Sequence, residues 1–94
     1  MTSTDTSLEI TMIGGNCPVQ AEGVLDGEPF YFRARGNRWS MGVGGTDPVT
    51  SPAWSYEAPY GAEPFEAGWM DVAEARAFIA LAAARYRASK ERPA

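Results

Sequence analysis

Hydrophobic and polar residues alternate along two consecutive segments of the chain, residues 19–25 and 28–35. Asp26 and Gly27 separate the segments, and Asp-Gly in this position favours a two-residue type I′ hairpin turn, because both turn positions need positive φ. The turn length fixes the register and places small residues of the first segment opposite large rings of the second. These segments are therefore predicted to form an antiparallel hairpin with one apolar face.

A second tight turn at Gly36 and Asn37, plausibly type II′, leads into a third segment, residues 38–43. The register from this turn gives the same apolar face as the first turn, and a one-residue slip would expose that face to water. Residues 8–13 also alternate, so we expect a fourth strand there. The predicted core face of the three-stranded meander consists of Val19, Ala21, Phe30, Phe32, Ala34, Trp39, Met41 and Val43.

Residues 44–69 contain four prolines and four glycines and show no clear period. The same stretch holds several aromatic residues, which a flexible linker would not contain. We therefore expect an ordered but irregular loop, and loops of this length in small domains tend to be functional or disordered.

Asp71 is a candidate helix N-cap, with Glu74 three residues later as its capping-box partner. The predicted helix spans residues 71–89, and apolar residues follow it at helical spacing. The stripe expected to face the sheet consists of Val72, Ala75, Ile79, Ala82 and Tyr86, widened by Phe78 and Ala83.

These elements predict an α+β fold: an antiparallel three- to four-stranded meander sheet with one C-terminal helix packed on its apolar face. We expect a flexible N-terminal tail over residues 1–7 and a single domain over residues 8–92. Within that domain the sheet spans 8–43, the acidic aromatic loop 44–69 and the helix 71–89.

Composition narrows the chemistry. The 94 residues include no histidine and one cysteine, and twelve Asp+Glu outnumber eight Lys+Arg for a net charge of −4. The usual general base and the commonest metal ligand are therefore missing, and a cysteine-cluster zinc site is excluded. Cys17, next to Pro18, is interpreted as structural filler, with a reactive thiol as the alternative. We expect no enzyme activity, no catalytic residue, no cofactor and no metal.

Charge is unevenly distributed. Between Trp39 and Ala75 the sequence has no Lys or Arg but six acidic residues. Carboxylates without basic neighbours project a negative field that speeds docking on a basic protein, and Tyr and Trp are favoured interface anchors. An equally weighted interpretation is that the rings extend the core and the acids keep the loop soluble. The candidate partner-binding residues are Asp47, Trp54, Tyr56, Glu57, Tyr60, Glu63 and Glu66.

The outer face of the predicted sheet suggests another function. Tyr31, Arg33, Arg35, Arg38 and Ser40 share that face by the register given above, and an aromatic ring with arginines on an open sheet is typical of RNA-binding sheets. The single aromatic residue and the negative net charge weigh against direct nucleic-acid binding, so it is kept as the alternative.

In size, acidity and lack of evident catalytic residues, the chain resembles anti-CRISPR proteins, the small inhibitors encoded by phages and mobile elements. They share no signature motif, so no residue is carried over. The resemblance implies a non-catalytic inhibitor that binds a Cascade-type CRISPR-Cas effector subunit and blocks target DNA binding by acidic mimicry or steric occlusion. An immunity or antitoxin protein is a further alternative. We expect a cytoplasmic protein of the host bacterial cell, with no membrane partner, as a monomer or weak homodimer.

Overall fold

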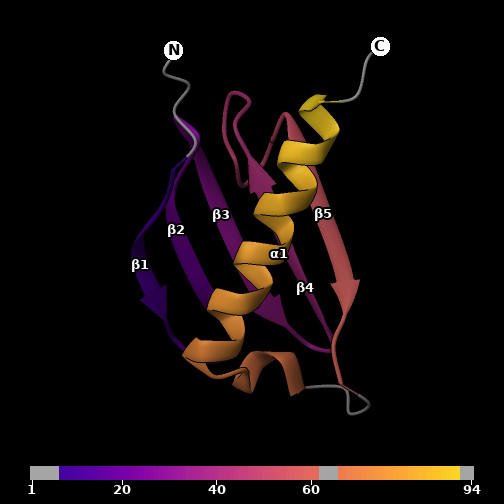
Figure 1. The fold of residues 1–94 in the computed structure, drawn as a ribbon. Coiled ribbons are helices and arrows are strands. Elements are labelled where there is room, and N and C mark those ends of the chain that lie inside the picture. The colour runs from indigo at the N-terminus through magenta and orange to yellow at the C-terminus, as the bar shows by residue number, and fades with distance from the viewer. Residues whose placement is uncertain (1–6, 62–65, 92–94) are drawn as a thin grey trace.

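Five antiparallel strands form one sheet and lie in chain order, β1-β2-β3-β4-β5 (Figure 1). The computed structural model describes residues 7–61 and 66–91. A short 3₁₀ helix, η1, precedes α1, which crosses one face of the sheet, so the predicted α+β fold is confirmed. The elements are β1 Leu8–Gly14, β2 Val19–Leu25, β3 Glu28–Arg35, β4 Arg38–Val43, β5 Trp54–Pro59, η1 Glu66–Trp69 and α1 Val72–Glu91.

Both tight turns have the backbone that the sequence predicts. Asp26 has a φ of 50° and Gly27 a φ of 84°, as a type I′ turn requires. Gly36 has a φ of 65°, which fits the first position of a type II′ turn. The resulting registers pair Ala21 with Phe32 and Ala34 with Trp39, as predicted.

The core lies between the sheet and α1. All eight predicted core residues of the meander are buried, as are four of the five residues of the predicted helix stripe. Val72 is the exception and remains 43% exposed, because the first turn of α1 lies at the end of the sheet. No polar or charged residue is buried among those that the structure describes, so hydrophobic packing dominates this core.

The first strand is present where predicted, but its alternation is interrupted. A β-bulge between Ile10 and Met12 shifts the register against β2. Beyond the bulge, Ile13 packs against the core and Met12 is 42% exposed. A bulge adds one residue to its strand, so the side chains after it change faces. Of the predicted tail, residues 1–6 lie outside the described residues, and the backbone oxygen of Ser7 accepts a hydrogen bond from the N–H of Asp26.

The fifth strand corrects the expectation of an irregular loop over residues 44–69. Residues 54–59 pair with β4 as an edge strand, so the sheet has five strands instead of three or four. Trp54, Tyr56 and Ala58 face inward and alternate with exposed residues. The alternation was masked by Pro59, which is tolerated at the end of an edge strand.

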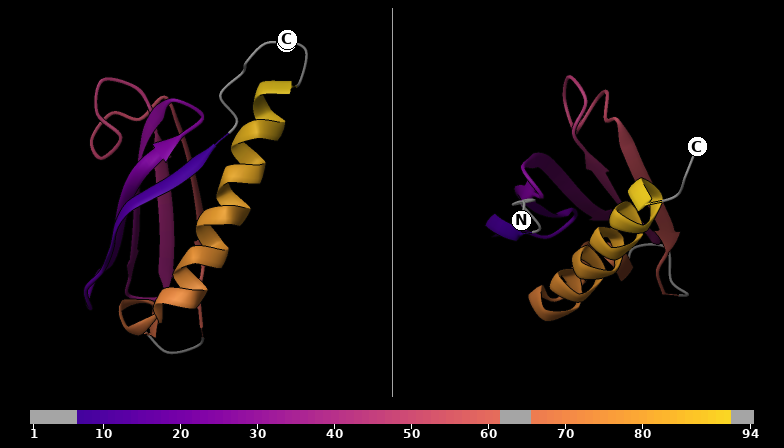
Figure 2. Two further views of the ribbon diagram at one scale, coloured as in Figure 1. Left: turned by 60° about the vertical axis from the view of Figure 1, so that its left-hand side comes forward. Right: turned by 45° about the horizontal axis from the view of Figure 1, so that its top comes forward.

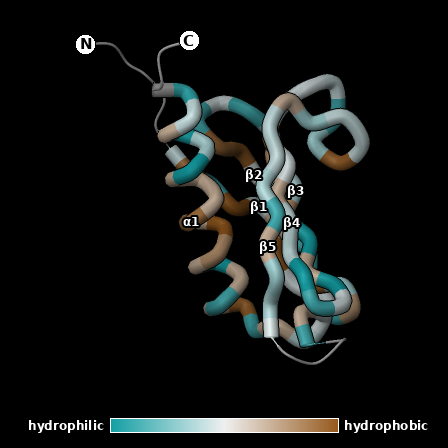
Figure 3. Tube along the Cα trace, turned by 90° about the vertical axis from the view of Figure 1, so that its right-hand side faces the viewer, coloured by the Kyte–Doolittle hydropathy of each residue, from teal (hydrophilic) through white to brown (hydrophobic). Residues whose placement is uncertain are grey.

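The remaining loop connects β4 to β5 and folds against the outer face of the sheet, opposite α1 (Figures 2 and 3). Gly42 permits this approach, because a Cβ at that position would collide with the backbone oxygen of Pro48. The loop is closed by the bridge between Asp47 and Ser51. One outer margin of the sheet is thus raised by a short wall of residues.

The helix begins at its predicted cap. The N–H of Glu74 donates to Oδ1 of Asp71 at 2.8 Å, and α1 continues two residues beyond its predicted end, to Glu91. Among the residues described, no helix is both long and apolar enough to cross a membrane.

Candidate functional site

A group of acidic residues surrounds Tyr60 at the end of the sheet where η1 and α1 begin. The hydroxyl of Tyr60 donates to Oε1 of Glu74 at 2.7 Å. This hydrogen bond and partial burial raise the pKa of Tyr60 to about 12, assisted by the negative charges of Glu74, Glu66 and Asp71. All three carboxylates are therefore close enough to Tyr60 to act on its hydroxyl. We call Tyr60, Glu66, Asp71 and Glu74 the basal acidic cluster.

Trp69 stands beside this cluster and is 66% exposed. It is the last residue of η1, and a 3₁₀ helix places residues three apart on the same side, so Trp69 lies next to Glu66. Large exposed rings are costly in water, and Trp is the residue most enriched among binding hot spots. The exposed indole is therefore available as an anchor for a partner.

Backbone contacts hold η1, and with it Trp69, in a defined position. The N–H of Cys17 donates to the oxygen of Gly68 at 2.8 Å, and the N–H of Ala67 donates to the oxygen of Gly36 at 2.9 Å. Gly68 packs so closely on Cys17 that a Cβ there would meet its Sγ. Cys17 is exposed and unpaired with another cysteine, and these contacts give its backbone a structural role.

Trp54 and Tyr56, two predicted anchors, lie half-buried on the inner side of β5. The ring of Trp54 packs edge-on against Tyr86, with centroids 5.4 Å apart, and the ring of Tyr56 lies 5.6 Å from that of Trp39. Arg85 of α1 covers Tyr56, with its guanidinium carbon 5.3 Å from the ring centroid. These contacts give both rings a packing role, and their role as anchors remains a prediction.

The predicted acidic residues do not gather in one place. Asp47 lies in the β4–β5 connection, at the opposite end of β5 from η1, and its Oδ1 accepts hydrogen bonds from the N–H groups of Val49 and Thr50. Glu57 lies on the outer face, with Oε2 3.8 Å from Nε of Arg38. Glu63 lies outside the described residues. Only Glu66, with Tyr60, belongs to the basal acidic cluster.

Sequence reasoning missed Trp69 as a site residue and assigned Asp71 and Glu74 only to capping. Asp71 does cap α1, but the carboxylate of Glu74 receives the Tyr60 hydroxyl. A large aromatic residue two positions before an N-cap was the available signal, because that position lies outside the helix and its side chain is not committed to the helix stripe.

The outer face of β3 and β4 carries the second set of predicted residues. The observed register pairs Tyr31 with Gly42, Arg33 with Ser40 and Arg35 with Arg38, so the predicted arrangement is confirmed. We call Tyr31, Arg33, Arg35, Arg38 and Ser40 the arginine face. It lies on the opposite side of the sheet from α1 and has the opposite charge to the basal acidic cluster.

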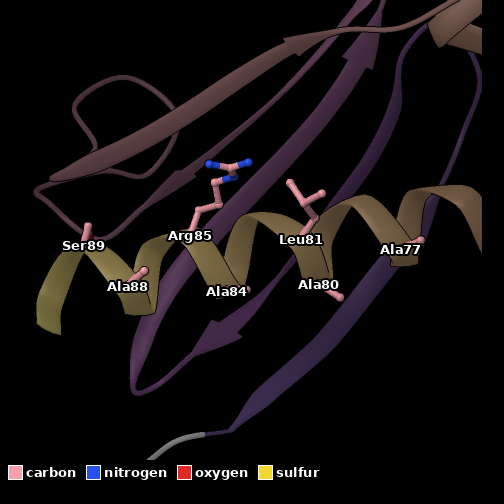
Figure 4. A pocket seen from close by; sticks show the side chains of 7 residues that line it. All are labelled: Ala77, Ala80, Leu81, Ala84, Arg85, Ala88 and Ser89. Atoms are coloured by element: carbon pink, nitrogen blue, oxygen red, sulfur yellow. The ribbon is translucent and has the colours of Figure 1, made fainter.

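A depression of about 760 Å³ lies on the exposed side of α1, between Ala77 and Ser89 (Figure 4). It is lined by residues of this one helix, mostly alanines with Leu81, and Arg85 is its only charged side chain. Such a surface offers apolar contact and no group of convergent reactive side chains. Among the described residues, no group of three or more His, Cys, Asp or Glu is arranged to hold a metal ion.

Comparisons with known proteins give no relative. No protein-family model, no curated protein and no solved structure matches the chain.

Proposed function

We propose that this chain is a non-catalytic binding protein that docks on a basic protein surface through its basal end. Trp69 serves as the anchor, and the basal acidic cluster supplies the complementary charge. The observation that carries the proposal is the position of the 66% exposed indole next to carboxylates that together raise the pKa of Tyr60 to about 12.

The electrostatics support a basic partner. Asp71 and Glu74 form no ion pair within the described part of the chain, so their charges are not cancelled by a neighbouring cation. Clustered charges of one sign raise the association rate with a surface of the opposite sign and align the two proteins as they meet. The negative net charge of −4 adds to this attraction.

The packing around Trp69 supports an anchor role. Its backbone is held by the η1 contacts with Gly36 and Cys17, so little backbone freedom remains to be lost on binding. An exposed aromatic ring on a pinned segment resembles the central residue of a hot spot, and the carboxylates form the polar surroundings.

The partner proposed for testing is a nucleic-acid-binding protein, and the resemblance to anti-CRISPR inhibitors points to a Cascade-type effector complex. Carboxylates held on a rigid scaffold can occupy a channel lined by Lys and Arg for phosphate groups, and thereby exclude target DNA. In this form of the proposal Glu66, Asp71 and Glu74 act as phosphate surrogates, with Glu63 as a further candidate. Asp47 and Glu57 lie elsewhere and are not required.

Equilibrium binding to a purified Cascade-type complex tests this proposal. The double variant Glu66→Gln/Glu74→Gln should lower affinity about tenfold and flatten the salt dependence. The matched control is Glu9→Gln/Glu22→Gln, which removes two negative charges from β1 and β2 at exposed positions. No measurable binding of the wild-type chain, or equal losses for the two double variants, would contradict the proposal.

A further inference from the structure

Three arginine side chains gather at one end of the outer sheet face, away from the basal acidic cluster. Arg33 and Arg35 are two residues apart on β3 and therefore point to the same face. Arg38 faces Arg35 directly across the β3–β4 pair. Like charges in directly opposed positions destabilise a sheet, so this arrangement is unfavourable unless an anion comes close.

The protein's own acids neutralise this group only in part. Glu57 lies 3.8 Å from Arg38, but the side chains of Arg38 and Glu57 are 54% and 60% exposed, so water screens the pair. Arg33 and Arg35 form no ion pair with any residue that the structure describes. An excess of positive charge thus persists on the surface of a chain whose net charge is −4.

The same face is hollowed. One depression of about 360 Å³ is lined by the three arginines, Ser40 and Glu57. A second, of about 310 Å³, shares Arg33, Ser40 and Glu57 with the first and continues to Tyr31 and the wall formed by Pro48 and Val49. The two therefore form a continuous groove with cations at one end and an aromatic ring with apolar groups at the other.

The ring at the far end is held in place. The hydroxyl of Tyr31 donates to Oε1 of Gln20 at 2.6 Å, which anchors its outer edge on the neighbouring strand. Tyr31 pairs with Gly42, whose missing side chain leaves the space above β4 to the Pro48 wall. A flat, weakly polar group can lie between the wall and the ring, as a base does in single-strand binding sites.

From these observations we infer that the arginine face is a binding site for single-stranded nucleic acid. Phosphates contact Arg33, Arg35 and Arg38, and an unstacked base lies at Tyr31 against Pro48. A single strand is favoured over a duplex, because the β4–β5 connection rises above the sheet and the groove accepts only a base that is not paired. This site lies on the other side of the sheet from α1 and does not depend on the proposed docking of the basal end.

Fluorescence anisotropy with a labelled oligonucleotide tests the inference, using single-stranded oligo(dT) and oligo(U) of about 20 nucleotides at about 50 mM salt. The wild-type chain should bind. Arg33→Gln/Arg35→Gln should lower affinity about tenfold and reduce the slope of log affinity against log salt by about two phosphate contacts. Glu57→Gln should strengthen binding, because it removes the negative charge from the groove.

The matched control is Arg76→Gln/Arg85→Gln, which removes the same charge from α1 on the opposite side of the sheet. This control should change affinity less than about twofold, since non-specific attraction depends on local phosphate contacts. Absence of binding by the wild-type chain, or equal losses in the two arginine double variants, would overturn the inference. Equal binding of a duplex, or displacement by thymidine monophosphate at the same phosphate concentration, would also overturn it. None of these outcomes bears on binding of a basic protein by Trp69.

Discussion

Arg87 and Asp26 form a two-pronged ion pair that ties the C-terminal part of α1 to the β2–β3 turn. Nε of Arg87 donates to Oδ2 of Asp26 and Nη2 to Oδ1, each at 2.9 Å. The parallel hydrogen bonds fix the relative position of the two groups as well as their charge. The pair therefore sets how the far end of the helix lies on the sheet, just as the Tyr60–Glu74 hydrogen bond ties its beginning to the residue after β5.

Asp26→Asn tests this pair without disturbing the turn, because Asn tolerates the positive φ of 50° at this position. The hydrogen bonds from Arg87 hold the pKa of Asp26 below its usual value of 3.8. The pair therefore stabilises the fold above about pH 4, and its contribution is lost as pH falls through the lowered pKa.

Urea unfolding should show Asp26→Asn to be less stable than wild type by about 1 kcal/mol at neutral pH, a value reduced by the partial exposure of Arg87. The difference should shrink in acid. A difference that is independent of pH would show that the charge of Asp26 contributes nothing.

Trp39 is the central ring of the core, and its removal should be costly. Its ring centroid lies 5.0 Å from that of Phe78 and 5.7 Å from that of Phe32, so it joins the sheet to the helix. Trp39→Ala should reduce the free energy of unfolding by about 3–5 kcal/mol, a large share of the total for a small domain. Chemical denaturation measures this, and a loss below about 1 kcal/mol would contradict the assigned packing.

Tyr60 should titrate last among the tyrosines whose pKa the structure perturbs. The hydrogen bond to Glu74 and the nearby carboxylates raise its pKa from 10.0 to about 12, so the protonated hydroxyl is favoured in the folded state. Its contribution to stability is present below pH 10 and is lost as pH rises towards 12.

Absorbance of tyrosinate during alkaline titration measures this pKa. Glu74→Gln should lower the pKa of Tyr60, whereas Glu28→Gln, at an exposed position at the start of β3, should leave it unchanged. A Tyr60 step near pH 10 in the wild-type chain would mean that the basal acidic cluster is not assembled in solution.

Two turns account for how much of the fold could be predicted from sequence. Asp26-Gly27 and Gly36-Asn37 each fix a register, and the two registers independently give one apolar face, so the meander and its core follow from local chemistry. β5 could not be predicted in the same way. It lacks a short turn to β4, and its short alternation stands between segments rich in proline and glycine. Tertiary pairing with β4 decides its conformation.

The site was predicted less well than the fold, because surface position depends on where the connections end. The register placed the arginine face correctly from sequence. Asp47, Glu57 and Glu66 are separated because β5 carries Glu57 along the outer face and places η1 at the opposite end from Asp47. Trp69 became prominent only when η1 directed it away from the core.

The role of Trp69 is tested most directly by its effect on binding to a Cascade-type complex, measured beside Leu81→Ala. Leu81 is a suitable control, because it is also an exposed large apolar residue, 41% exposed on the open side of α1. Trp69→Ala should weaken binding by about 2 kcal/mol or more, as a hot-spot residue does, while Leu81→Ala leaves it unchanged and both variants unfold as wild type does. Wild-type affinity in Trp69→Ala would show that the exposed indole is not the anchor.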